Sequence, residues 1–311
     1  MSENLNYCIK NKNLSYLISD EFINEINLYK NEIKKHVINN NIVSLFVSND
    51  ICFFEKLYIS IFKELNIPSF IFVHGLQFWL NEMDFTRSDY LVVWGSLSKQ
   101  DFVKKGMPAS KVIISGHPSY NINEKPNLKF DFDNILVLGK SIPGSKPSDD
   151  YTLSDRSNSI LYLFYIQDCL TRLGVKKVRF RPHPSENSKW YTDNIDNDFF
   201  IIDNMDIKKS LNESSLVIGP TSTVLFEALL LGVNYVVFEP LNQYNKSFDG
   251  YNIPTLYNGD NPKVPVANNV LELLEILKSK KSVDISVLDE LSNSKFKVDT
   301  IYEIIMNQLK T

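Results

Sequence analysis

Short apolar runs alternate with amphipathic stretches along most of the chain. The runs are rich in β-branched and aromatic side chains, which is typical of strands buried in a parallel sheet. The strands that this pattern predicts are Ile42–Val47, Ser69–Val73, Tyr90–Trp94, Lys111–Ser115, Asn134–Leu138, Lys177–Phe180, Phe199–Ile202, Ser215–Ile218 and Asn234–Phe238.

Apolar residues recur at helical spacing in the segments around these strands. The predicted helices are Glu21–Val37, Ile51–Leu65, Ser96–Lys105, Asn158–Leu173 and Thr223–Leu231, with another capped by Asp206 and one or two in the tail Val283–Leu309. Strands that alternate with helices predict parallel sheets joined by crossover helices.

The alternation is interrupted by the polar, proline-containing stretch Asn121–Lys129, which we interpret as a linker. We therefore predict an α/β protein with two Rossmann-like domains, residues 1–122 and residues 130–311, the second including the terminal helices. Their parallel sheets would face a central cleft.

Composition narrows the classes of function. The chain has 311 residues, 43% of them hydrophobic, and a formal net charge of −4, so no domain-wide basic field attracts nucleic acid. Cys8, Cys52 and Cys169 form no CxxC pair, which argues against a disulfide framework and a cysteine zinc site. No apolar stretch approaches the ~20 residues of a membrane span, and the N-terminus lacks the apolar core of a signal peptide. We expect a soluble, cytoplasmic protein.

Ligands of open parallel sheets bind beyond the carboxyl ends of the strands, so polar residues there are the candidates for chemistry. The strongest is Thr221-Ser222-Thr223, which follows Gly219-Pro220 and opens a predicted helix. Hydroxyls and unpaired N–H groups at a positive helix end form an anion site. The alternative is ordinary capping by one hydroxyl. Glu227, one turn on, either accepts hydrogen bonds from ribose hydroxyls or is a carboxylate favoured by the helix dipole.

The second candidate is Arg181-Pro182-His183-Pro184, at another strand end. The flanking prolines fix the backbone on both sides of the histidine. Arg181 and His183 could neutralise a leaving phosphate and donate a proton to it. The alternative is a rigid loop with an exposed histidine. Together with Arg181 and Pro184, we place Gly139 and Lys140 among the donor-binding candidates.

The third candidate lies in the first domain, where Asp50 and His74 end two successive predicted strands. Either could be the general base that deprotonates an acceptor hydroxyl. The alternatives are a helix cap for Asp50 and a turn histidine for His74. His117-Pro118 repeats the His-Pro pair, but a turn that leaves a strand explains it without chemistry.

Residues 40–245 resemble a known superfamily. The stretches VSND, IPSFIFVHGLQ and SDYLVVWGSLSKQDFVKKGMPASKVIISGHPSYN resemble the N-terminal half of GT-B fold enzymes such as UDP-GlcNAc 2-epimerase-like proteins. RPHP followed by GPTSTVLFEALLLGVNYVVFEP is similar to their donor-binding domain. The His-Pro with a later Ser/Thr cluster is also similar to bacterial sialyltransferases and capsule Kdo transferases, which use CMP-sugars. It is similar as well to teichoic-acid polyol-phosphate transferases, which use CDP-polyols.

The resemblance implies an inverting, metal-independent GT-B glycosyltransferase that needs no cofactor. It would move sialic acid or a related ulosonate from a CMP-sugar to an O-antigen or capsule acceptor. Residues 1–122 would form the acceptor-side domain and residues 130–311 the donor-binding domain. The expected partners are the nucleotide sugar and a lipid-linked glycan, with at most peripheral contact with the inner membrane.

The resemblance also assigns roles to residues. His183, Ser222 and their neighbours Thr221 and Thr223 would contact the donor phosphate, and Asp50 or His74 would face the acceptor. Two alternatives stay open. One is a CDP-polyol phosphotransferase of the teichoic-acid type, and the other is a non-catalytic partner subunit of the same fold that binds no nucleotide.

Overall fold

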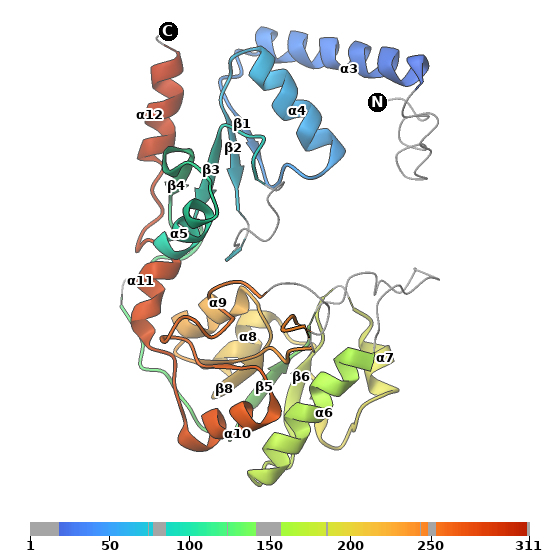
Figure 1. The fold of residues 1–311 in the computed structure, drawn as a ribbon, viewed down its shortest axis with the longest axis vertical. Helices are drawn as coiled ribbons and strands as arrows, with labels where there is room; N and C mark the ends of the chain where they lie inside the picture. The colour runs from blue at the N-terminus through green and yellow to red at the C-terminus, as the bar shows by residue number, and fades with distance from the viewer. Residues whose placement is uncertain are drawn as a thin grey trace.

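The computed structural model describes residues 19–73, 75–76, 85–122, 124–140, 157–184, 186–242, 244–247 and 253–309. These residues form two lobes, each built on a parallel sheet (Figure 1). The prediction of an α/β protein with two parallel sheets is confirmed.

The first lobe contains a four-stranded sheet in the order β1-β2-β3-β4. Its strands are β1 (Leu45–Val47), β2 (Ser69–Phe72), β3 (Tyr90–Val93) and β4 (Val112–Ile114). Its helices are α3 (Asp20–Asn39), α4 (Phe53–Glu64) and α5 (Ser96–Lys104). The strand order follows the order in the chain, so each predicted apolar run lies beside the next.

The second lobe contains a six-stranded sheet in the order β10-β9-β8-β5-β6-β7. Its strands are β5 (Ile135–Leu138), β6 (Val178–Arg181), β7 (Phe200–Ile202), β8 (Leu216–Gly219), β9 (Asn234–Phe238) and β10 (Val266–Ala267). Its helices are α6 (Ser157–Arg172), α7 (Ser188–Thr192), α8 (Ile207–Asn212), α9 (Val224–Leu230) and α10 (Val270–Ser279). Every residue of β5, β8 and β9 is buried, which explains why these strands are almost wholly apolar in the sequence.

The predicted strands are all present, and most are shorter by a residue or two. The largest difference is β1, which begins at Leu45 instead of Ile42 because only Leu45–Val47 pair with β2. Helix α4 begins at Phe53 instead of Ile51, because the Asn49 side chain accepts hydrogen bonds from the N–H groups of Ile51 and Cys52 and holds a turn there. Sequence reasoning did not predict α7, β10 and α10.

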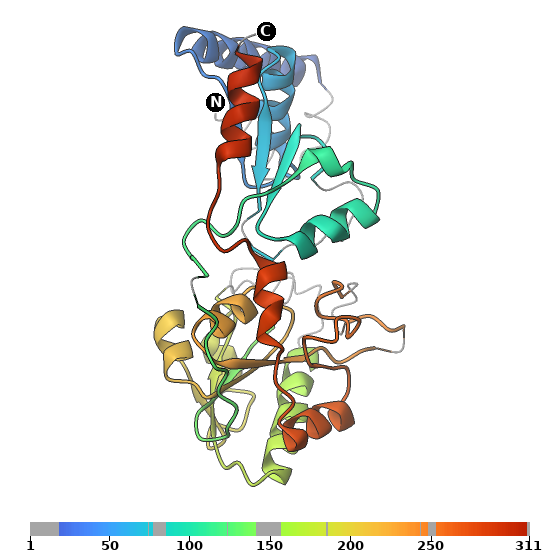
Figure 2. The ribbon, with the colours of Figure 1, turned by 90° about the vertical axis from the view of Figure 1, so that its left-hand side faces the viewer.

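The end of the chain returns to the first lobe. After α11 (Leu288–Leu291), helix α12 (Asp299–Gln308) lies beside the first-lobe sheet, where Ile301 packs against Phe70 and Ile113 (Figures 1 and 2). The sequence-based prediction assigns the terminal helices, within residues 130–311, to the second domain. The apolar residues of α12 instead cover a face of the first sheet.

Two segments connect the lobes. The first crossing lies between β4 and β5, the second crossing lies between α11 and α12, and the two run side by side (Figure 2). The Ile122 N–H donates to the Ser294 carbonyl at 2.8 Å, and the Lys297 N–H donates to the Ser115 carbonyl at 2.7 Å. Gly95 lies against α11 so closely that an added Cβ would be 2.3 Å from the Glu290 carbonyl oxygen. The second crossing therefore binds both the first crossing and the first lobe.

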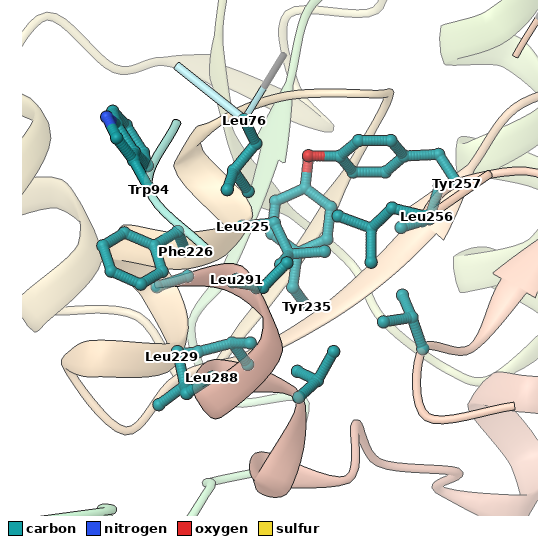
Figure 3. Close-up of a cluster of buried hydrophobic side chains, with 14 of the residues drawn as sticks. Leu76, Trp94, Leu225, Phe226, Leu229, Tyr235, Leu256, Tyr257, Leu288 and Leu291 are labelled. Atoms are coloured by element: carbon teal, nitrogen blue, oxygen red, sulfur yellow. The ribbon is translucent and has the colours of Figure 1, made fainter. Parts of the chain in front are cut away.

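One buried apolar cluster extends through both lobes (Figure 3). Trp94, which follows β3, and Phe226 of α9 both belong to it, and their ring centroids are 5.7 Å apart. His117 lies beside them, 4.2 Å from the Trp94 ring and 5.6 Å from the Phe226 ring. The lobes are therefore held together by a shared core as well as by covalent connections.

Candidate functional site

Three neighbouring strand ends of the second sheet bring the main candidates together. Strand β5 lies between β6 and β8, with Leu138 opposite Arg181 and Val137 opposite Ile218. Adjacent strands are about 4.8 Å apart. Gly139 and Lys140, which follow β5, are therefore flanked by the His183 loop on one side and by the Thr221–Thr223 turn on the other.

Gly139 packs directly against the His183 loop. Its N–H donates to the Arg181 carbonyl at 2.8 Å. A Cβ on Gly139 would be 3.1 Å from the Pro182 Cα and 3.2 Å from the His183 nitrogen. The loop thus lies over the end of β5, with the His183 side chain exposed. Partial removal from water lowers the pKa of the imidazole from its ordinary 6.5.

The hydroxyl-rich turn has a different partner at each residue. The Thr221 N–H donates to Glu239 Oε1 at 2.5 Å. The Ser222 hydroxyl accepts a hydrogen bond from the Val224 N–H at 3.2 Å. The Thr223 hydroxyl accepts one from the Leu76 N–H of the first lobe at 3.2 Å. Ser222 therefore bonds the first N–H of α9, and Thr223 joins the lobes.

Lys140 and Glu239 form an ion pair at this site that sequence reasoning missed. Lys140 Nζ is 2.6 Å from Glu239 Oε2, and the carboxylate is completely buried. The other carboxylate oxygen of Glu239 accepts the Thr221 N–H, so one group links the ends of β5, β8 and β9. The signal in the sequence was a lone carboxylate that directly follows the mostly apolar strand Asn234–Phe238.

Arg181 faces the β7–α8 side of the site. Its guanidinium lies 3.4 Å from Asp203 Oδ1 and 3.3 Å from the Ser210 hydroxyl, and it also donates to the Met205 carbonyl. Arg179 binds the other oxygen of Asp203 at 2.9 Å. This geometry gives Arg181 a role in holding the segment that leads into α8. Its role toward the donor stays a prediction, as does that of the exposed Pro184.

Glu227 lies on the same side, at the wall of a pocket of about 280 Å³. The pocket is also lined by Tyr120 and Asn121 of the first crossing and by Lys208 of α8. Burial, and next the charge of Asp206, raise the pKa of the Glu227 carboxyl. A half-buried carboxyl that opens onto a pocket fits the predicted contact with ribose hydroxyls, which stays a prediction.

Asp50 is held inside the first lobe. Its carboxylate is completely buried and accepts the Phe85 N–H and the Arg87 N–H, both at 2.8 Å. The Arg87 guanidinium is 3.8 Å from the same carboxylate. These contacts favour a structural role, in which Asp50 fixes the segment before β3, over access to an acceptor hydroxyl.

His74 lies outside the described residues, but its two successors are described. The Leu76 N–H bonds Thr223, and a Cβ on Gly75 would be 2.7 Å from the Thr223 hydroxyl oxygen. The segment after β2 therefore meets the turn of the second lobe, which brings the first-lobe candidate region next to the donor-side candidates.

His117 lies at the junction between the lobes. Its Nδ1 accepts the Ser119 N–H at 3.0 Å, and its backbone N–H donates to the Ser292 hydroxyl at 2.9 Å. Burial lowers the pKa of its imidazole. The prediction of a turn without chemistry is compatible with these contacts, and the structure adds a packing role between the lobes.

Within the described part of the chain, no three His, Cys, Asp or Glu side chains gather as a metal-binding group. In the same residues, none of the helices is both long and apolar enough to cross a bilayer.

The architecture and strand-end geometry define a two-domain α/β fold of the GT-B and epimerase type, and comparison with solved structures supports this assignment. The UDP-N-acetylglucosamine 2-epimerase of Rickettsia bellii matches 94% of this chain and 81% of its own, with a TM-score of 0.54 and 12% identity. The UDP-GlcNAc 2-epimerase of Methanocaldococcus jannaschii, solved in complex with UDP-GlcNAc and UDP, matches 91% of this chain and 80% of its own, with a TM-score of 0.52 and 13% identity. No family model and no curated protein sequence matches the chain. At these identities the likeness shows the fold.

Proposed function

We propose that the chain is an inverting, metal-independent glycosyltransferase that takes a sugar from a nucleotide donor. The observation that carries this proposal is the convergence of Lys140, His183 and the Thr221–Thr223 turn at three adjacent strand ends. An imidazole and hydroxyls around one strand end, beside a lysine that balances the charge of the buried Glu239 carboxylate, suit a negatively charged leaving group. The hydrogen bond between Thr223 and Leu76 supports the proposal, because it joins this site to the first lobe, to which we assign the acceptor.

The reaction would use the two lobes for different tasks. A base takes the proton of the acceptor hydroxyl, the acceptor oxygen bonds to the anomeric carbon, and the bond from that carbon to the donor phosphate breaks. His183 and the hydroxyls of Ser222 and Thr221 stabilise the departing phosphate, and His183 supplies a proton to it. Loss of one such contact typically costs about 2.7–4 kcal/mol of transition-state stabilisation.

Of the two base candidates, the contacts favour His74. The Asp50 carboxylate is buried and accepts two backbone N–H groups, so it would have to break these bonds to reach an acceptor. His74 directly precedes Gly75, which touches Thr223.

The donor that we propose is a CMP-activated sialic acid or related ulosonate, and the acceptor is a lipid-linked surface polysaccharide at the inner face of the membrane. This choice rests on the resemblance of the His-Pro and Ser/Thr motifs. A UDP-sugar is the second candidate, because the M. jannaschii epimerase of similar fold was solved with UDP-GlcNAc and UDP.

The test is to incubate the protein with CMP-sialic acid, CDP-glycerol and UDP-GlcNAc and to measure the nucleotide released and the epimer formed. Release of CMP from the first donor supports the proposal. Release of CMP from CDP-glycerol indicates polyol-phosphate transfer, and epimerised UDP-GlcNAc without transfer indicates an epimerase. If none of the donors reacts and no nucleotide binds, the result favours the non-catalytic partner subunit over an enzyme that uses these donors.

A further inference from the structure

Three consecutive residues of the Pro220–Ser222 turn are each held by a different buried side chain. The Tyr235 hydroxyl donates to the Pro220 carbonyl at 2.7 Å. The Glu239 carboxylate accepts the Thr221 N–H at 2.5 Å. The Tyr257 hydroxyl donates to the Ser222 carbonyl at 2.8 Å.

The three side chains that hold the turn belong to the interior of the second lobe. Tyr235 and Glu239 are completely buried, and Tyr257 is 1% exposed. The two tyrosines belong to the buried cluster that contains Leu225 and Leu256 (Figure 3). Their hydroxyls therefore bind the turn from the interior of the lobe, whereas the Thr221 and Ser222 side chains are partly exposed.

Gly219 is required by the same arrangement. An added Cβ would lie 2.2 Å from the Tyr235 hydroxyl oxygen, so this hydroxyl occupies the space that a side chain at position 219 would fill. The Tyr235 side chain can therefore reach the turn only because position 219 carries no side chain.

We propose that Tyr235, Glu239 and Tyr257 are positioning residues that hold the Pro220–Ser222 turn in the conformation that binds the donor phosphate. This inference rests on the proposed function, because it names the residues that prepare the same phosphate site. None of the three touches the donor. The two tyrosine hydroxyls bind the carbonyls of Pro220 and Ser222, and the Glu239 carboxylate binds the Thr221 N–H, so the backbone of the turn is fixed.

The chemistry of these groups suits a permanent role of this kind. Burial raises the pKa of both tyrosines, so their hydroxyls stay protonated and continue to donate over the whole physiological pH range. Glu239 also binds Lys140 at 2.6 Å, which ties the cation beside β5 to the same turn. A site that is held in its binding conformation before the ligand arrives loses less entropy on binding.

The test uses tyrosine-to-phenylalanine variants, which remove one hydroxyl and keep the ring. Tyr235→Phe and Tyr257→Phe are the test variants, and Tyr162→Phe is the matched control. Tyr162 is also buried in the second lobe, but its hydroxyl has no hydrogen-bond partner among the residues that the structure describes. For each full-length variant, CMP and UDP affinities are measured by calorimetry. Hydrogen exchange of the peptide spanning residues 219–224 is measured by mass spectrometry.

We expect Tyr235→Phe and Tyr257→Phe each to weaken nucleotide binding about tenfold and to speed exchange at the Thr221 amide by a similar factor. Tyr162→Phe should change neither. Glu239→Gln, which keeps an acceptor for Thr221 but loses the charge that holds Lys140, should weaken binding with a smaller change in exchange.

Two results would overturn the inference. One is unchanged affinity and exchange in both test variants, even with reduced stability, because the tyrosines would then only support the core. The other is an equal effect in Tyr162→Phe. If the wild-type protein binds neither nucleotide, the proposed function fails for these donors, and exchange alone decides whether the tyrosines hold the turn.

Discussion

The hydroxyl of Thr223 accepts a hydrogen bond from the backbone N–H of Leu76 at 3.2 Å, although the two residues belong to different lobes. Thr223 ends the hydroxyl-rich turn of the second lobe, and Leu76 follows the end of β2 in the first. The candidate acceptor and donor regions are therefore in direct contact. A reaction between two bound substrates needs the two binding regions to be close together.

This contact predicts that Gly75→Ala destabilises the protein. A Cβ at this position would lie 2.7 Å from the Thr223 hydroxyl oxygen, so the Thr223 side chain or the segment that contains Gly75 has to shift. We expect a loss of about 1–3 kcal/mol in the free energy of unfolding, measured by urea denaturation. The same substitution in a Thr223→Ala background should cost clearly less, because the clashing oxygen is gone. Equal losses in both backgrounds would show that the two residues do not touch.

A second prediction concerns Asp50, whose carboxylate accepts two backbone N–H groups. Asp50→Asn leaves one amide oxygen to accept and directs an NH₂ group toward the other N–H. We expect a loss of about 2–4 kcal/mol in the free energy of unfolding. Asp133→Asn, at an exposed aspartate, is the control and should change stability by less than about 0.5 kcal/mol. Unchanged stability in Asp50→Asn would argue against the structural role and reinstate Asp50 as a base candidate.

The third prediction concerns turnover and its pH dependence at His183. Because the side chain is exposed, His183→Ala should fold normally, but it should lower the turnover of the active donor at least ~100-fold. Partial removal from water lowers the pKa of the imidazole, and the protonated form is the one that donates to the phosphate. Turnover in the wild-type protein should therefore fall as the pH rises through a midpoint below 6.5, and His183→Ala should lose this midpoint. Near-normal turnover in the variant would refute the role.

A fourth prediction follows from the packing of His117 against both Trp94 and Phe226. Burial lowers the pKa of this imidazole in the folded protein, so the unfolded chain binds the proton more readily. The stabilising contribution is complete above the unfolded pKa and is lost as the pH falls through and below 6.5. His117→Phe, which keeps an aromatic ring, should reduce the loss of stability between about pH 8 and about pH 5. An identical slope in both proteins would show that His117 does not titrate differently on folding.

The strands could be predicted from the sequence because they are apolar runs between polar ends, and such runs fit the interior of a parallel sheet. The strand-end rule also selected His183 and Thr221–Thr223, which follow the two strands on either side of β5. Both inferences start from local patterns that a single stretch of chain contains, and the roles of His183 and Thr221–Thr223 stay predictions.

Other features depend on partners that are distant in sequence. The apolar residues of α12 indicate that the helix packs against other apolar residues, but they do not indicate whether these belong to the first sheet or to the second. Asp50 follows a strand, as a base would, and only the fold shows that the Phe85 and Arg87 N–H groups bind it. The pairing of Glu239 with Lys140 likewise joins residues that no short motif connects.

Nucleotide binding at the turn beside His183 underlies the proposed reaction, and a calorimetric titration tests this binding directly. Wild-type protein, Ser222→Ala and His183→Ala are titrated with CMP and with UDP. We predict that the wild type binds one of the two nucleotides and that each substitution weakens this binding about tenfold or more while the protein stays folded. Binding that neither substitution affects, or no binding of either nucleotide, would contradict the proposed donor site.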